Sequence, residues 1–122
     1  LNEDVGLLAF SALAAGLLTG KYQNNKVPAD SRKSISPELG GRVTDRVWSA
    51  VDKYMEIGAK YQIDPVHLSI AWCSSRSFMC STIIGATNVA QLSHILGSKD
   101  VEISEDCLFD IDNAHKEVPM PF

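Results

Sequence analysis

Gly6-Leu-Leu-Ala-Phe10 is an apolar stretch that runs directly into the small-residue segment Ser11-Ala-Leu-Ala-Ala-Gly-Leu-Leu-Thr-Gly-Lys-Tyr22. A second stretch of the same kind, Ser81-Thr-Ile-Ile-Gly-Ala-Thr-Asn-Val-Ala-Gln-Leu92, follows later in the chain. Each has the composition of a short strand that opens into a loop, and the residues between them have a mostly helical pattern. The order strand, loop, helices, strand, loop, helix predicts an α/β protein containing two consecutive βα units.

The strands and the longest loop are predicted from composition. Residues 5–10 form a nearly continuous apolar run, which predicts a strand buried on both faces. The second strand is expected at residues 81–84. Residues 23–41 shift to Asn, Lys, Pro, Ser and Gly, which predicts a long surface loop.

Four helical segments follow from spacing and capping residues. Residues 42–61 have an apolar face opposite a charged one, which is typical of an outer amphipathic helix. Asp64-Pro65 is a strong helix start, and the helix after it is apolar around most of its circumference, so we expect it to be buried. Thr87 or Asn88 begins a helix that Gly97 is expected to end. Ser104 caps a last helix, whose predicted inner stripe is Leu108, Ile111 and Ala114.

The composition excludes several classes of protein. The chain has 122 residues, of which 45% are hydrophobic and 21% charged, as expected of a globular domain. A net charge of −4 argues against a nucleic-acid partner. No apolar run is long enough for membrane insertion, and no secretory leader is recognisable.

The cysteines and histidines have no pattern typical of a disulfide framework or a metal site. Three cysteines without metal-ligand spacing favour free thiols in a reducing compartment, so we expect a cytoplasmic location. His67, His94 and His115 fall on three different expected elements, and no zinc site is expected. Because two βα units cannot close a barrel, we expect the 122 residues to be a fragment of a larger domain.

Two loops have the chemistry of an anion site. Gly85-Ala-Thr-Asn88 is a glycine-containing turn onto a helix start, where unpaired amide groups can bind a phosphate and Thr87 adds a hydroxyl. The alternative is a tight turn with a Thr or Asn cap. Gln91 lies one turn into the helix, where it either reaches a ligand or is exposed. The loops after the last strands of a (β/α)8 barrel commonly bind phosphate in this way.

The segment from Ser11 to Tyr22 is the second candidate. Gly16 and Gly20 allow tight backbone curvature, while Lys21 and Arg32 supply cations that could neutralise a pyrophosphate or a ribose 2′-phosphate. The alternative is a solvated loop with two surface cations.

These residues together resemble one family. Phe10-Ser-Ala-Leu-Ala-Ala-Gly-Leu-Leu-Thr-Gly-Lys-Tyr22 is similar to the SPLxxGxLTGKY loop of aldo-keto reductases, and most similar to the branch that includes the potassium-channel β subunits. Leu68-Ser-Ile-Ala-Trp-Cys73, Ser81-Thr-Ile-Ile-Gly-Ala-Thr-Asn88 and Gln91-Leu92 match that branch in order and spacing. The resemblance covers about residues 7–115. It implies a partial TIM (β/α)8 barrel, namely its last two βα units plus a C-terminal helix.

The resemblance also implies a cofactor, NADP(H), and a role for individual residues. The first loop would wrap the nicotinamide side and the pyrophosphate, the two cations would lie near the phosphates, and the second loop would hold the adenosine end. The residues concerned are Phe10, Ser11, Leu13, Ala14, Ala15, Gly16, Lys21, Arg32, Gly85, Thr87 and Gln91. The catalytic Asp, Tyr, Lys and His of the family belong to the first half of the barrel, so no catalytic residue is assigned here.

Three positions depart from the family pattern. Ala12 stands where the family usually has proline, so the loop loses a fixed φ. His94 and Ile95 stand where the channel-subunit branch has Glu and Asn that contact adenine. Ile95 cannot make a polar contact, which weakens the expected recognition of adenine.

Three functions are compatible with these residues. The first is the C-terminal, cofactor-binding portion (residues 1–122) of a single barrel domain that reduces small-molecule aldehydes or ketones by hydride transfer, the isolated piece being inactive. The second is a nucleotide-binding regulatory subunit with a channel partner. The third is an unrelated phosphate-binding barrel enzyme, which would need neither Gln91 nor the Ser11 loop. A homo-oligomer is compatible with each of them.

Overall fold

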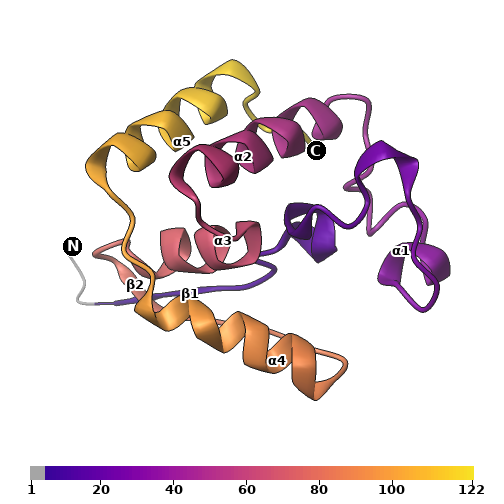
Figure 1. Cartoon of the computed structure of the whole chain (residues 1–122), viewed down its shortest axis with the longest axis horizontal. Coiled ribbons are helices and arrows are strands. Elements are labelled where there is room, and N and C mark those ends of the chain that lie inside the picture. Colours follow the sequence, from indigo (N-terminus) through magenta and orange to yellow (C-terminus); the bar gives the residue numbers. More distant parts are fainter. Residues whose placement is uncertain (1–4) are drawn as a thin grey trace.

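The computed structural model describes residues 5–122, which form two strands and a set of helices in the expected α/β order (Figure 1). Helices α5 and α2 lie side by side at one edge of the molecule, α3 lies next to them, and α4 lies at the opposite edge (Figure 1). The elements are β1 (Leu7–Ala9), the 3-10 helices η1 (Ala14–Thr19) and η2 (Gln23–Asn25), α1 (Arg32–Ile35), α2 (Val47–Tyr61), α3 (Pro65–Ser74), β2 (Met79–Thr82), α4 (Val89–Leu96), η3 (Gly97–Asp100) and α5 (Glu105–Glu117).

The two strands pair in parallel, with Leu7 opposite Met79, Leu8 opposite Ser81 and Ala9 opposite Thr82. The register skips Cys80, which produces an irregularity between Leu7 and Leu8. At this point the backbones approach closely, because a Cβ atom on Gly6 would lie 2.6 Å from the Cβ of Cys80. Glycine is therefore required at position 6 by space.

Two expectations about the strands are wrong in detail. The second strand begins at Met79, so the predicted 81–84 is shifted by two residues. The first strand is not buried on both faces: Leu7 is 49% and Leu8 57% exposed. A parallel strand is buried only when elements cover both faces of its sheet, and the described residues contribute a sheet of two strands.

The start of α3 follows the local sequence. The Asp64 side chain accepts hydrogen bonds from the amides of Val66 (2.9 Å) and His67 (3.3 Å), and Pro65 occupies the first helical position. The buried residues of α3 are spread around most of the helix, as predicted from its apolar circumference. Helix α2 begins at Val47 and not at 42, because the backbone and side-chain oxygens of Thr44 both accept from the Val47 amide.

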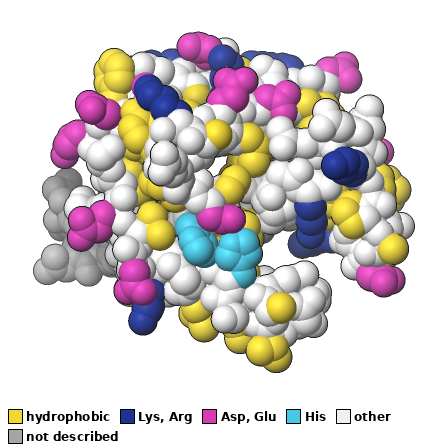
Figure 2. Space-filling view, in the orientation of Figure 1, with side chains coloured by type: hydrophobic (Ala, Val, Ile, Leu, Met, Phe, Trp, Pro, Cys, Tyr) yellow, Lys and Arg dark blue, Asp and Glu magenta, His cyan; other side chains and the backbone are white. Residues whose placement is uncertain are grey.

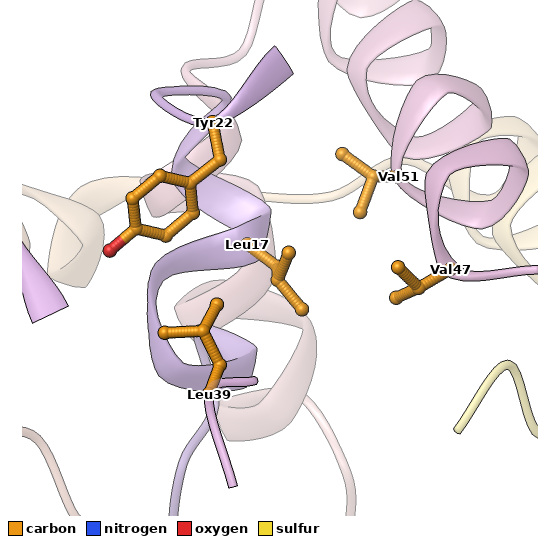
Figure 3. Packing of buried hydrophobic residues seen from close by; sticks show 5 residues of the cluster. All are labelled: Leu17, Tyr22, Leu39, Val47 and Val51. Atoms are coloured by element: carbon orange, nitrogen blue, oxygen red, sulfur yellow. The ribbon is translucent and has the colours of Figure 1, made fainter. Parts of the chain in front are cut away.

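The segment 23–41 is only partly the surface loop that its composition predicts. It contains the short helix α1, and Leu39 is completely buried. Figure 3 shows Leu39 beside Leu17 of η1, with Val47 and Val51 of α2 facing them and Tyr22 above. This apolar cluster fixes the segment to the rest of the molecule.

The C-terminal helices also refine the predictions. Helix α4 ends at Leu96, directly before Gly97, as predicted. Gly97 has a φ of −60°, and the chain continues into the 3-10 helix η3. Helix α5 is capped by the Ser104 hydroxyl as predicted. Its buried residues are Cys107, Ile111 and Ala114, so two members of the predicted stripe are buried, while Leu108 is only half-buried.

Two general features complete the fold. Within residues 5–122, every helix is too short or too polar to cross a bilayer. All three cysteines are free thiols, and burial raises the pKa of the Cys73 and Cys107 side chains. Both of these thiols are therefore protonated at neutral pH and pack as small apolar groups.

Candidate functional site

The two candidate loops leave the sheet side by side. The amide of Ile83 donates a 2.7 Å hydrogen bond to the carbonyl of Ala9, which continues the strand pairing to the carboxyl ends of both strands. Beyond this bond, Ala12 and Leu13 of the first loop and Ile84 of the second pack against one apolar cluster. That cluster consists of Val66, Ile70 and Ile95. The bases of the two loops therefore share one edge of the molecule.

The backbone of the first loop has an unusual conformation. Ala14, Ala15 and Gly16 have φ values of 48°, 58° and 96°, so three consecutive residues lie in the left-handed region. Short turns hold them there: the Ala14 amide donates to the Ser11 carbonyl at 2.8 Å and the Gly16 amide to the Leu13 carbonyl at 2.9 Å. The amides of Ala14 and Gly16 are therefore used within the loop, and the left-handed residues give its backbone a tight curve.

Lys21 lies over this loop. A Cβ atom on Gly16 would be 3.1 Å from Lys21 Cε, so the lysine stem runs directly across the glycine. Its ammonium lies 5.0 Å from the centre of the Tyr22 ring. Tyr22 is completely buried, and its hydroxyl accepts a hydrogen bond from the Lys33 amide. The aromatic ring thus fixes the position of the cation.

Lys33 is a second cation beside this loop, and it is not among the predicted site residues. Its ammonium lies 5.8 Å from the Tyr22 ring centre and 4.7 Å from that of Trp48. Lys21 and Lys33 therefore share one aromatic residue. In the sequence, only the neighbouring Arg32 points to a cation at this place. The contact of Lys33 with Trp48 could not be predicted, because it depends on how helix α2 packs.

Among the predicted site residues, Phe10 and Arg32 have exposed side chains that are not held against the rest of the candidate site. Phe10 is 73% exposed at the end of β1. Arg32 is the first residue of α1, and its exposed side chain makes no hydrogen bond or ion pair to residues 5–122. Both are free to contact a ligand, and neither is positioned by the contacts described.

The second loop is held by its own side chains. The Gln91 Oε1 atom accepts from both the amide and the hydroxyl of Thr87, each at 3.0 Å, and the Asn88 side chain accepts from the Gln91 amide at 2.9 Å. These bonds cap the N-terminus of α4, as in the alternative of a capped turn. The side-chain NH2 group of Gln91 keeps its donors. A Cβ atom on Gly85 would have nothing within 4 Å, so this turn is open to a ligand.

The positions that depart from the family pattern have structural roles. Ile95 is only 5% exposed and belongs to the apolar cluster beneath both loops. His94 Nε2 lies 3.1 Å from Asp64 Oδ1, so this histidine is engaged with α3. The Ile95 side chain is therefore not available to contact an adenine, and His94 Nε2 is directed toward Asp64.

Tyr54 and Tyr61 both have a pKa above the ordinary tyrosine value. Tyr61 donates a 2.8 Å hydrogen bond to Asp110, and burial together with this carboxylate raises the pKa of its hydroxyl. Burial and the negative charge of Asp112 raise the pKa of Tyr54. Tyr54 and Tyr61 both pack at the contact between α2, α3 and α5. No catalytic role is assigned to them.

Comparisons of the sequence with protein families and with known proteins find several similar proteins. A sequence model of the aldo/keto reductase family matches residues 1–116. Protein tas of Escherichia coli is 34% identical over 119 residues, which are 98% of this chain and 34% of that protein. A probable voltage-gated potassium channel subunit beta of Arabidopsis thaliana is 35% identical over 103 residues, 82% of this chain and 31% of that protein.

A solved structure has a similar fold. The glycerol dehydrogenase of Gluconobacter oxydans superposes with a TM-score of 0.71 at 20% identity, and the match covers 99% of this chain and 37% of that one. The chain thus spans about a third of the length of the relatives that it matches.

Proposed function

This chain belongs to the aldo/keto reductase family, and on that premise we propose that it is the cofactor-binding portion of an NADP(H)-dependent reductase of aldehydes and ketones. Residues 1–122 would form the last two βα units and C-terminal helix of a single (β/α)8 barrel in the cytoplasm. The observation that carries the proposal is the common edge of the two loops, joined by the bond from Ile83 to Ala9.

The residues of the first loop fit the negatively charged part of a dinucleotide. The left-handed backbone at Ala14, Ala15 and Gly16 would let the loop curve around a pyrophosphate, and the ammonium of Lys21 lies across the same turn. Phe10, Ser11 and Leu13 come first after the strand, where the nicotinamide would lie. The half-buried Leu13 gives that end a fixed apolar wall.

The residues of the second loop fit the adenosine end. Gly85 lets a ligand approach the backbone. Thr87 orients the Gln91 side chain, whose NH2 donors lie at the start of α4, where helix amides favour negative charge. Arg32 and Lys33 would reach the phosphates from α1.

The cofactor and the described residues would have different roles in the reaction. When bound, NADPH supplies the hydride that reduces the substrate carbonyl carbon. The described residues neutralise its phosphates and orient its rings, while the proton donor is proposed to lie outside these 122 residues. The isolated chain should consequently bind the dinucleotide weakly and show no reductase activity.

Substitutions of Lys21 and Arg32 test whether these side chains bind the cofactor. Lys21→Met and Arg32→Gln remove one charge each, and the matched control Lys26→Met removes a charge from the exposed neighbouring turn. We expect each of the first two variants to weaken binding of NADPH about tenfold, the usual value of one charge-assisted hydrogen bond. Fluorescence titration with NADPH measures this. Equal affinities for all four proteins would contradict the proposal.

The similarity to potassium-channel β subunits supports a second candidate, a nucleotide-binding regulatory subunit with a channel partner. Both candidates require the cofactor site, so the titration does not separate them. Turnover of a carbonyl substrate by the whole barrel would separate them, because a regulatory subunit needs only to bind.

A further inference from the structure

Asp64, His67 and His94 form a cluster outside the proposed cofactor site. One potential ligand atom from each residue lies within 4.8 Å of the other two. His94 Nε2 is 3.1 Å from Asp64 Oδ1, and the two imidazole ring centres are 4.9 Å apart. Figure 2 shows a pair of adjacent histidine side chains with an acidic side chain against them, open to solvent on this face.

The spacing of these atoms suits a tetrahedral metal. Zn2+ binds imidazole nitrogen and carboxylate oxygen at about 2.0–2.2 Å, which places neighbouring ligands about 3.3 Å apart. The pair formed by His94 and Asp64 already has this separation. His94 and Asp64 are 48% and 40% exposed, so an ion can reach them, and water can complete the coordination.

One ligand atom is already held in place, and a second has to change its partner. Asp64 Oδ1 is fixed by the amides of Val66 and His67 because it caps α3. His67 Nε2 lies 2.7 Å from the carbonyl of His94. To bind a metal, this nitrogen exchanges the carbonyl for the ion, and its proton moves to Nδ1 or to solvent.

The absence of a side chain at Gly97 is an independent observation, because it leaves space for the His67 ring. Its φ of −60° and ψ of −18° are open to any residue, so the backbone does not require glycine. A Cβ atom at position 97 would nevertheless lie 3.0 Å from His67 Nε2 and 3.1 Å from its Cε1. The missing side chain leaves the space in which the Nε2–Cε1 edge of His67 lies, beside the carbonyl of His94.

We propose that Asp64, His67 and His94 bind one Zn2+ ion that joins the start of α3 to the end of α4. The sequence placed the histidines on different elements, and the packing of α3 against α4 brings two of them together. Since the unfolded chain lacks the site, the ion stabilises the folded state. This proposal does not depend on the cofactor-binding function.

The experiment is a metal titration with three readouts. All proteins carry Cys80→Ser, which removes the exposed thiol as a competing ligand. Equilibrium dialysis measures Zn2+ bound per chain, and Co2+ absorption reports tetrahedral coordination. The variants are His67→Gln, His94→Gln and Asp64→Asn, which keeps a helix cap. His115→Gln, an exposed histidine on α5, is the matched control.

We expect one Zn2+ per chain, a loss of affinity of tenfold or more in each ligand variant, and no change in the control. Chemical modification of histidine in the parent protein gives a result even if a variant fails to fold: Zn2+ should protect His67 and His94 but leave His115 reactive. Equal protection of all three, protection of none, or unchanged binding in folded ligand variants would overturn the proposal.

Discussion

Single residues in this protein occupy backbone conformations that L-amino acids seldom adopt. Ala14 and Ala15 have positive φ values directly beside Gly16, in the loop proposed to bind the pyrophosphate. Each such residue costs on the order of 1 kcal/mol, and such strain is common at binding sites. Gln62 has the same conformation (φ 55°) at the end of α2, far from that loop in sequence, so it allows the cost to be measured without affecting ligand binding.

The first prediction concerns Gln62. Its amide donates to the carbonyl of Ala59 at the helix end, where glycine is the preferred residue. Gln62→Gly should stabilise the chain by about 0.5–1 kcal/mol, because relief of the left-handed strain exceeds the extra entropy of the unfolded state. Gln62→Val should destabilise it. Urea unfolding at one fixed chain concentration measures both changes, and a less stable Gln62→Gly protein would contradict the argument.

At the scale of elements, α5 is fastened to α2 by polar contacts along their common edge. Asp110 accepts hydrogen bonds from Lys60 (2.6 Å) and from the Tyr61 hydroxyl (2.8 Å). Lys53 and Glu117 form a further ion pair between the same helices. The apolar side chains of Ile57, Cys107 and Ile111 pack beneath these contacts.

The second prediction is a pH dependence. The hydrogen bond from Lys60, followed by that from Tyr61, lowers the pKa of Asp110 below its usual 3.8. A carboxyl whose pKa falls on folding stabilises the native state above its unfolded pKa, and this stabilisation is lost as the pH falls through the folded value. Asp110→Asn should therefore unfold at lower urea than wild type at pH 7, and the difference should disappear as the pH falls below the folded-state pKa of Asp110.

The control for this prediction is Asp112→Asn on the same helix. Asp112 is an exposed carboxylate without a hydrogen bond to residues 5–122. Its substitution should change the urea midpoint much less at pH 7. The same loss in both variants, or a difference for Asp110→Asn that persists in acid, would show that the contact with Lys60 and Tyr61 is not responsible.

The elements that the sequence predicts best are those whose causes are local. Asp64, Asn88 and Ser104 cap the three helices that follow them, because each side chain needs only amides two or three residues away. Burial could not be predicted in the same way. Leu39 is buried within a polar segment, and Leu7 and Leu8 are exposed within an apolar one, because both outcomes depend on distant elements.

The residues of the candidate site also fall into those that the sequence indicates and those that only the packing of distant elements brings together. The loop residues and Lys21 could be identified from glycines, small residues and charge. Lys33 could not, because the aromatic ring of Trp48 reaches it only through the packing of α2. The meeting of His67 with His94 likewise depends on the contact between α3 and α4. The shared edge of the loops was implied by parallel pairing alone.

At the scale of the whole molecule, the exposed surface is larger than that of a compact monomer. It measures 7940 Å², whereas a compact protein of 13.3 kDa exposes roughly 6,400 Å². Large apolar side chains are exposed on and directly after β1, on either side of β2 and on α4, including Leu8, Phe10, Ile83 and Val89. An apolar surface of this extent normally marks a place where other protein covers it.

The third prediction follows from this surface. The 122-residue chain should self-associate in solution, with an apparent mass that rises with concentration. Leu8→Lys combined with Val89→Lys should reduce the association, while Ile35→Lys, a substitution of an exposed residue on α1, should change it less. Sedimentation velocity over a range of concentrations measures the effect. A monomer of 13.3 kDa at every concentration would contradict it.

The central claim is that the loops after β1 and β2 bind one dinucleotide together. Hydrogen–deuterium exchange at short times, with and without millimolar NADP+, tests it directly in the chain as it is. We predict slower exchange in residues 11–16 and in residues 85–91 at the same concentration of NADP+, with no change in α5. Protection of only one loop, or of neither at saturating NADP+, would contradict the claim.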